Sequence, residues 1–590
     1  MSTSVIFDQR PGVSKRRPVD NQDFMAVILV GYGDNLYPFN QGTNVVSKAM
    51  LPIGNVPIIN SVVDWVLVSG LRDILIIVPP PFYTSVAEHI SEHYSMATHP
   101  KARIEIRRTT EGEKEDDEEQ SENTHRASSG LVQREGTARL LRRFKNWIRT
   151  DFVLLPCDLS PPVSLPLTSI LDRHRSSPDA VLTSVFYEPT ESVKDGEEKI
   201  LVAMDKETDE LLLIQPLEGM EDDLELRSAL INSHPTLSLT TRLSDAHIYV
   251  LRRTVLDLLS TRRSKDLDSM REQVIPWLIK GGWQKGLGRR WAPILNPPQK
   301  DPFAAALARS TTSDPASSAF STISPESSPH FSHVPLPSSK NPRSASASTE
   351  SNGSNSMQNS MLIDPEEPIK MTHQKGVIGW KCKVIVSAPQ PVAVATAGAA
   401  AAGTAKGGKQ QQGKDKTPPA EPDYLIRSNT LAGYWELNRR FLRTLASSAK
   451  ATFSGGSSIN SNNNSNAIAT RAAGLINEEA VGPAPAISPA AQISPDSLIG
   501  EGTRVGEKAS IKKCIIGRHC VIGKNAKLTG CVLWDFVTVE ENARIENTII
   551  CSNGRIGEKS QIKDCEFGTG FEAKPGAILK GERLVAGQEA

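Results

Sequence analysis

A turn with two glycines and a nearby lysine is the first group of residues whose types and spacing suit chemistry. Gly31 and Gly33 follow the apolar run Phe24–Val30, and Lys48 comes shortly afterwards. Glycines at the end of a buried strand let backbone N–H groups approach phosphate oxygens, and a lysine supplies a compensating positive charge. A plain tight turn and a solvated lysine explain the same residues, so the pattern alone indicates a phosphate site only weakly.

Two further segments fit the same chemistry. Gly136, Thr137 and Ala138 precede a segment with the apolar spacing of a helix, and Asp158 lies just past the end of a predicted strand. Parallel α/β sheets bind their ligands at the carboxyl ends of strands, where an aspartate can hold a metal-bound nucleotide. An aspartate that caps a turn has the same position in sequence, and both interpretations stay open.

The elements around these residues alternate between strand and helix. Phe24–Val30 and Ile74–Val78 are continuous apolar runs, which indicate buried strands, and Pro57–Ser69 has helical apolar spacing between them. Strand, helix and strand in this order form a βαβ unit, so a parallel sheet is expected. Further strands are predicted at Arg103–Arg107, Asp151–Leu155, Ala180–Phe186, Ile200–Met204 and His247–Leu251.

The C-terminal part repeats aliphatic residues at intervals of 6, 6 and 5, a period of 17. The three series are Ile499, Ile516, Leu533, Ile550 and Phe567; Val505, Ile522, Val539 and Ile556; and Ile511, Leu528, Ile545, Ile562 and Leu579. Glycines keep the same period at 500, 517 and 568 and at 506, 523 and 557. Three inward aliphatic residues per turn, each near a corner residue able to take unusual backbone angles, predict a three-sided parallel β-helix whose coils stack about 4.8 Å apart.

Composition and charge argue against several classes of protein. The 590 residues include 67 basic and 67 acidic ones without a basic stripe, so direct nucleic-acid binding is not expected. The sequence has no run of 18 consecutive apolar residues, so no membrane span is predicted. The first 23 residues lack the apolar core of a secretory signal. Three of the seven cysteines, Cys514, Cys531 and Cys565, share one column of the repeat. They fit small buried hydrophobes, so we expect no metal site and a reducing, cytosolic location.

Together these motifs resemble the sugar-nucleotide pyrophosphorylase family. Leu36-Tyr37-Pro38-Phe39 matches the end of that family's first loop, and Lys48 matches its lysine segment. Gly136-Thr137-Ala138 matches its segment beside the base, Asp158 its metal-binding aspartate, and Asp245–Val250 one of its strands.

The departures from that family concern its catalytic loop. Val30 stands where the family has its first glycine, and Asp34-Asn35 stands for its Thr-Arg pair. The resemblance gives the missing arginine the role of stabilising negative charge on the triphosphate, and losing such a donor typically costs about 10²–10³ in rate. We therefore expect no catalytic residue, no cofactor, and at most residual nucleotide or Mg²⁺ binding. The vestigial nucleotide-binding residues would be Gly31, Gly33, Lys48, Gly136, Thr137 and Asp158.

Three longer segments are similar to the gamma-subunit family of eukaryotic translation initiation factor 2B. They are Lys48–Ile59, Thr150–Leu159 and Arg427–Tyr434. The resemblance implies a non-catalytic assembly and regulatory subunit of the guanine-nucleotide exchange factor that promotes GDP–GTP exchange on translation initiation factor two. It also implies a homologous catalytic epsilon subunit, the other exchange-factor subunits and initiation factor two as partners. The chain ends at Ala590, soon after its last β-helix position, which leaves no room for the epsilon subunit's helical domain and favours gamma.

Two other functions remain as alternatives. One is an active sugar-1-phosphate nucleotidyltransferase, similar to a mannose-1-phosphate guanylyltransferase. The other is a β-helix acyltransferase, for which only His519 argues. Trp534 and Phe536 point outward from the predicted coils and are candidates for contact with a partner protein.

The expected fold class is α/β: a Rossmann-like nucleotidyltransferase domain, then a left-handed parallel β-helix of hexapeptide-type repeats with a 17-residue coil, with long disordered insertions. The expected order is a flexible tail at 1–23, the nucleotidyltransferase-like domain at 24–297 with a disordered loop at about 108–129, a disordered insertion at 298–365, the remainder of the α/β domain at 366–446 with a low-complexity linker at about 388–420, a linker at 447–493, and the β-helix at 494–584.

Overall fold

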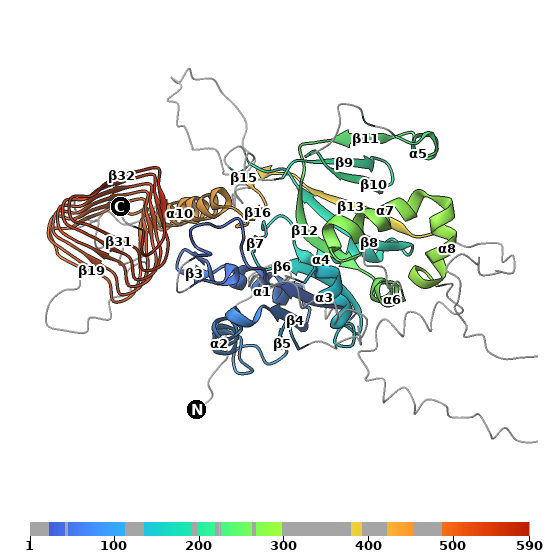
Figure 1. The fold of residues 1–590 in the computed structure, drawn as a ribbon, viewed down its shortest axis with the longest axis horizontal. Coiled ribbons are helices and arrows are strands. Elements are labelled where there is room, and N and C mark those ends of the chain that lie inside the picture. Colours follow the sequence, from blue (N-terminus) through green and yellow to red (C-terminus); the bar gives the residue numbers. More distant parts are fainter. Residues whose placement is uncertain are drawn as a thin grey trace, which may run out of the picture.

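The computed structural model contains an α/β domain and a C-terminal β-helix, with a long helix between them (Figure 1). The residues it describes are 23–41, 45–111, 135–190, 193, 198–218, 224, 226–261, 267–297, 379–391, 422–453 and 487–588. The predicted tail at 1–23 apart from Asp23, the predicted insertion at 298–365, and most of the predicted loop at 108–129 and of the linkers at 388–420 and 447–493 lie outside these residues.

A seven-stranded sheet forms the centre of the α/β domain, in the order β13-β8-β12-β6-β1-β4-β5. Its strands are β1 (Phe24–Leu29), β4 (Asp73–Val78), β5 (Arg103–Arg108), β6 (Asp151–Pro156), β8 (Ala180–Tyr187), β12 (Ser244–Leu251) and β13 (Lys381–Ser387). Strand β12 is antiparallel to both of its neighbours, and the other pairs are parallel. The predicted parallel sheet is therefore present, with one reversed strand.

Helices cover both faces of this sheet, so strands such as β1 are buried on both sides and are apolar throughout. One face carries α1 (Ile59–Val68), α2 (Tyr83–His93) and α4 (Leu167–Arg175). The other carries α3 (Thr137–Arg143), α6 (Thr254–Thr261), α7 (Ile275–Trp283) after the π-helix η6 (Met270–Val274), and α8 (Lys285–Leu295). Along β1, alternate residues enter the two cores, which fixes the sheet between the two helical layers.

Smaller elements complete the α/β domain. A three-stranded sheet contains β9 (Ile200–Asp205), β10 (Leu211–Pro216) and β11 (Leu237–Thr240), beside α5 (Ser228–Ser233). Three short strand pairs are β2 (Pro52–Ile53) with β3 (Val56–Pro57), β7 (Leu159–Ser160) with β16 (Ile426–Arg427), and β14 (Gln390–Pro391) with β15 (Pro422–Asp423). The described residues also form the 3-10 helices η1 (Lys48–Met50) and η2 (Pro80–Phe82). The predicted strand at Ile200–Met204 thus belongs to the small sheet and not to the central one.

The β-helix has three parallel sheets, one for each side of the coil (Figure 1). The first sheet has β17 (Gln492–Ile493), β20 (Ser510–Lys512), β23 (Lys527–Thr529), β26 (Arg544–Glu546), β29 (Gln561–Lys563) and β32 (Ile578–Lys580). The second has β18 (Leu498–Ile499), β21 (Ile515–Ile516), β24 (Val532–Leu533), β27 (Ile549–Ile550), β30 (Glu566–Phe567) and β33 (Arg583–Leu584). The third has β19 (Arg504–Val505), β22 (Val521–Ile522), β25 (Thr538–Val539), β28 (Arg555–Ile556) and β31 (Glu572–Ala573). The strands pair in the 17-residue register, for example Leu528 with Ile545. All three predicted aliphatic columns are buried in one core, and Cys514, Cys531 and Cys565 are buried with them.

The glycine columns of the β-helix have a different cause from the one predicted. Positive φ occurs at three other corner columns, such as Lys513, Gly530, Asn547, Asp564 and Gly581. Gly517 is not among the positive-φ residues, but an added Cβ there would lie 2.6 Å from the backbone carbon of Trp534 in the next coil. Gly523 and Gly557 meet the next coil in the same way. The prediction of unusual angles is wrong for these glycines: at each of them the backbone of the next coil lies where a Cβ would be, although Trp534 and Glu540 carry side chains at the equivalent positions one coil later.

Helix α10 (Leu431–Phe453) lies between the β-helix and the α/β domain (Figure 1). It continues past residue 446, where the predicted α/β domain ends. The first coil is also reached earlier than residue 494, because Ile487 already pairs with Val505. Among the residues described, no helix combines the length and the apolar character that crossing a membrane requires.

Candidate functional site

The structure brings together two of the predicted site residues, Lys48 and Asp158. Lys48 begins η1, which Ser47 caps, and Asp158 lies between β6 and β7 at the carboxyl end of the central sheet. The Lys48 Nζ is 2.7 Å from Asp158 Oδ2, and the two side chains are 9% and 1% exposed. A lysine and an aspartate predicted to act on a nucleotide therefore form a buried ion pair with each other.

A third charged side chain, Arg427, completes this group from a distant part of the sequence. Its strand β16 pairs with β7, and the Ser428 N–H donates to the Asp158 carbonyl at 2.9 Å. One guanidinium nitrogen of Arg427 is 3.3 and 3.2 Å from the two carboxylate oxygens of Asp158. Lys48 Nζ also donates to Asn429 Oδ1 at 2.6 Å. The segment Arg427–Asn429 thus occupies the space in front of the aspartate.

The charges in this group fix the protonation of its members. Burial alone would raise the pKa of Asp158, but Arg427 and Lys48 outweigh it and hold the pKa well below its usual range. Burial, followed by Arg427 and Arg271, holds the pKa of His247 well below its usual value, so this imidazole is neutral. The result is one ionised carboxylate between two cations.

This arrangement does not fit a magnesium ion. Mg²⁺ needs octahedral oxygen coordination, and both oxygens of Asp158 already face Arg427, with Lys48 beside them. Throughout the described ranges, no group of three or more His, Cys, Asp or Glu side chains is placed to hold a metal ion. A metal would have to displace Arg427 from the carboxylate first.

A polar cavity of about 270 Å³ lies beside the charged group. It is lined by Asn35, Glu198, Glu218, Asp245, His247, Arg271, Arg427 and Asn429. Asn35, which stands where the resembled family has its arginine, faces this cavity, and Arg271 is paired with Glu198 at 2.6 Å. Asp245 accepts the His247 N–H at 2.8 Å and the Tyr249 hydroxyl, and burial raises its pKa.

The remaining predicted site residues have other surroundings. Gly33 has a φ of +78°, and an added Cβ there would lie 3.1 Å from Leu36, while one at Gly31 would meet nothing within 4 Å. Gly136 and Thr137 are covered by the chain itself: Thr137 Oγ1 accepts the Met270 N–H at 2.9 Å, and a Cβ at Gly136 would lie 2.2 Å from Asp268 Oδ2. The predicted base segment therefore packs against residues 268–270.

Sequence reasoning missed Arg427 as a member of the site. Asp158 and Arg427 are 269 residues apart, and no spacing rule connects them. The one available signal was an arginine directly after the apolar Tyr424-Leu425-Ile426, because a charge in a buried strand needs a counter-charge.

Of the two predicted partner contacts, Trp534 lies in an interface within the chain. It is 4% exposed, its Nε1 donates to the Tyr434 hydroxyl at 2.9 Å, and its ring lies 5.3 Å from that of Phe39. It does point outward from the coil, as predicted, but α10 and the segment 36–39 cover it. Phe536 is 55% exposed and stacks on His519 with 5.3 Å between ring centroids. A role for Phe536 in contact with a partner stays a prediction.

The segment predicted to end the phosphate loop packs against the β-helix. Leu36 and Phe39 are buried with Trp534 and Ile549, and the Tyr37 hydroxyl donates to the Arg583 carbonyl at 3.3 Å. The contact therefore holds this segment between the α/β domain and the β-helix.

Comparison with known proteins agrees with this fold. Residues 25–195 match the family model described as Nucleotidyl transferase, and residues 483–576 match the one described as EIF2B subunit epsilon LbH domain. The predicted fold class, a nucleotidyltransferase domain followed by a left-handed β-helix, is confirmed by these matches and by the parallel strands.

Three curated relatives carry the name Translation initiation factor eIF2B subunit gamma. The protein of Schizosaccharomyces pombe is 29% identical over 270 residues, which are 45% of this chain and 52% of the relative. That of Dictyostelium discoideum is 20% identical over 255 residues (40% and 52%), and that of Caenorhabditis elegans is 24% identical over 243 residues (40% and 54%). The chain spans about half the length of the curated relatives it matches. The predicted resemblance to this family is confirmed.

Proposed function

We propose that this chain is a non-catalytic assembly and regulatory subunit of the guanine-nucleotide exchange factor that promotes GDP–GTP exchange on translation initiation factor two. Its partners would be a homologous catalytic epsilon subunit and the other exchange-factor subunits, with initiation factor two as the substrate of the assembly. It would work in the cytosol, without direct contact to nucleic acid or membrane. Relatives named as the gamma subunit support the assembly, and the buried group of Asp158, Lys48 and Arg427 carries the non-catalytic part.

The physical argument rests on what a nucleotidyl transfer would need at this place. A triphosphate needs free cations and a metal ion to neutralise its charge as the bond to the leaving pyrophosphate breaks. Here Lys48 is bound to Asp158 and Asn429, and Asp158 is shared with Arg427. Freeing these groups means breaking a buried ion pair, which costs about 3–5 kcal/mol. In this proposal the chain uses no cofactor at this site, and its α/β domain contributes contacts to the assembly.

The association with other subunits is tested by native mass spectrometry of the tagged full-length chain, isolated from its own cells at modest salt. We expect the chain in a complex with several different subunits that captures initiation factor two. A chain that arrives alone or only with copies of itself contradicts the proposal.

The absence of catalysis is tested separately, by pyrophosphate release from GTP and mannose 1-phosphate with Mg²⁺. We expect no release above the blank for the wild type and none for Asn35→Arg, because the added arginine would enter a cavity that Arg271 and Arg427 already line. Asn35→Gln is the matched control. Turnover by the wild-type chain would establish the alternative, a working sugar-1-phosphate nucleotidyltransferase.

A further inference from the structure

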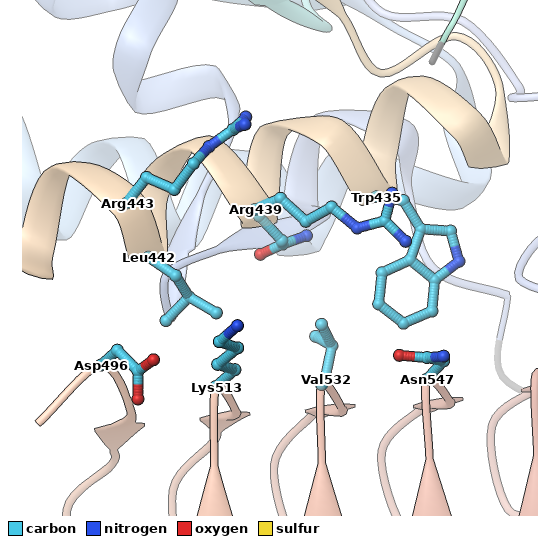
Figure 2. Close-up of a pocket in the computed structure, with 10 residues that line it drawn as sticks. Trp435, Arg439, Leu442, Arg443, Asp496, Lys513, Val532 and Asn547 are labelled. Atoms are coloured by element: carbon cyan, nitrogen blue, oxygen red, sulfur yellow. The ribbon is translucent and has the colours of Figure 1, made fainter. Parts of the chain in front are cut away.

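A groove between α10 and one corner of the β-helix has the build of a small-molecule site (Figure 2). Its volume is about 330 Å³, and pockets for small ligands start at about 300 Å³. The α10 wall is formed by Trp435, Asn438, Arg439, Leu442 and Arg443. Their spacing of three and four residues places them on one face of the helix, toward the β-helix.

The opposite wall is a corner column of the β-helix. Asp496, Lys513, Gly530 and Asn547 follow one another at the 17-residue period, and Val532 lies beside them. Figure 2 shows Lys513, Val532 and Asn547 pointing from the coils toward α10. Gly530 has no side chain, and even a Cβ there would lie 2.7 Å from Asn547 Oδ1. Gly530 therefore leaves this part of the wall without a side chain.

Two cations enter the groove from opposite walls, Arg439 from α10 and Lys513 from the β-helix. Within the described part of the chain neither of them forms an ion pair, whereas Arg443 is paired with Glu436 at 2.5 Å. The acidic lining residue, Asp496, accepts a hydrogen bond from Ser494. The lining therefore carries an excess of positive charge that an anion can neutralise.

The groove also offers flat and apolar surface. The guanidinium of Arg439 lies 5.5 Å from the ring centre of Trp435, and Leu442 and Val532 add aliphatic contacts. A ligand that satisfies both properties has an anionic group attached to a small flat body.

We propose that this groove binds a small organic phosphate. Its phosphate lies between Arg439 and Lys513, and its body packs on Trp435, Leu442 and Val532. Since the two cations belong to different parts of the fold, the ligand ties α10 to the β-helix and opposes their separation. The inference does not rest on the proposed function, because it uses only the two walls of the groove.

The test is calorimetric titration of the full-length chain with phenyl phosphate at low ionic strength, where charge contacts are screened least. We expect one site per chain, with affinity lowered at least tenfold by Arg439→Gln and by Lys513→Gln. Both side chains are exposed, so these variants should fold. Lys524→Gln, at another exposed corner position, is the matched control and should bind as the wild type does.

Two further probes separate the parts of the proposal. Phenol, which lacks the phosphate, and inorganic phosphate, which lacks the ring, should each bind at least tenfold more weakly than phenyl phosphate. If inorganic phosphate binds as tightly as phenyl phosphate, the groove is a simple anion site, and the proposal that it recognises the organic body of the ligand is overturned. The proposal as a whole is overturned if phenyl phosphate does not bind at millimolar concentration, or if the wild type and both Gln variants bind it equally well.

Discussion

At the scale of single residues, Asp158 is the buried counter-charge of two cations. It is one buried anion between two buried cations, Lys48 and Arg427, while the nearby His247 is neutral. Removing the anion leaves two like charges without compensation, whereas removing Arg427 leaves a neutral Lys48–Asp158 pair. The three residues therefore differ in how much stability depends on them, although they belong to one group.

This charge count predicts an order of stabilities. We expect Asp158→Asn to destabilise the α/β domain by about 3–5 kcal/mol, the cost of uncompensated buried charge, and Arg427→Gln by about half of that or less. Hydrogen exchange of the β6 amide groups at pH 7 measures the free energy of opening for both variants. If Arg427→Gln were the more damaging of the two, the charge argument would be wrong.

The neutral state of His247 predicts a pH dependence. Its pKa in the folded chain lies well below the value of about 6.5 in the unfolded chain, so acidification protonates the unfolded state first and lowers stability. Between pH 7.5 and 5.5 this costs about 1.4 kcal/mol. We expect His247→Asn to remove that loss, as measured by exchange of β6 amides at both pH values.

His519→Asn is the control for this measurement. Both histidines have left-handed backbones, with φ of 57° and 52°, which asparagine accepts, but His519 is exposed. It should keep the pH dependence of the wild type. Asp245, whose pKa is raised, is present in every variant and cancels in the comparison.

Part of this site was predictable and part was not. Lys48 and Asp158 were found because their places, after a turn and at a strand end, are local features of the sequence. Their pairing with Arg427 depends on the contact of β16 with β7, which joins residues about 269 positions apart, and tertiary contacts of that range leave no periodic signal.

At the scale of elements, the β-helix uses glycine for two distinct reasons. At Gly517 the neighbouring coil comes too close for any side chain, whereas Gly576 has a φ of +76° and open space around its Cβ position. The column of Gly576 contains Asn525 and Asn542 at the same left-handed backbone, so a side chain is tolerated there.

One substitution at both positions separates these reasons. We expect Gly517→Asn to destabilise the β-helix by about 3 kcal/mol, since the clash is with backbone that cannot move aside, and Gly576→Asn to cost less than about 1 kcal/mol. Thermal unfolding of the two full-length variants measures the difference. Equal losses would mean that the coils can separate to admit a side chain.

The β-helix itself was predictable because each coil needs buried aliphatic residues at the same three positions as the coil before it. This requirement appears in the sequence as a 17-residue period. The outward face was not, because residues such as Trp534 look the same in sequence whether solvent or another element covers them. The positions of α10 and of the segment 36–39 decide this, and the separation of 100 residues between Trp534 and Tyr434 hides it.

At the scale of the whole molecule, one apolar contact joins the two bodies. Trp534 and Ile549 from the β-helix share a buried cluster with Phe39, Leu51 and Tyr434, and Asn55 Nδ2 donates to the Ile516 carbonyl at 2.8 Å. Such a core-like interface predicts that the two bodies hold together without a covalent link.

This is measurable after cutting the chain at a protease site inserted between residues 454 and 486. We expect the two fragments to elute together in gel filtration at micromolar concentration. Trp534→Ala, a loss of about 3–5 kcal/mol, should separate them, while Phe536→Asn, at an exposed left-handed position, should not. Fragments of the unsubstituted chain that separate would contradict a core-like interface.

The order of segments along the chain also determines how force passes through the molecule. Arg427 lies in the two-residue strand β16, and α10 begins at Leu431 and carries Tyr434, the partner of Trp534. Tension between the β-helix and the central sheet is therefore shared between two routes: the direct contacts of Phe39 with Trp534 and of Asn55 with Ile516, and the route through Tyr434, α10 and β16. Along the second route β16 is the shortest element, with two residues, and loss of its pairing with β7 would withdraw Arg427 from Asp158.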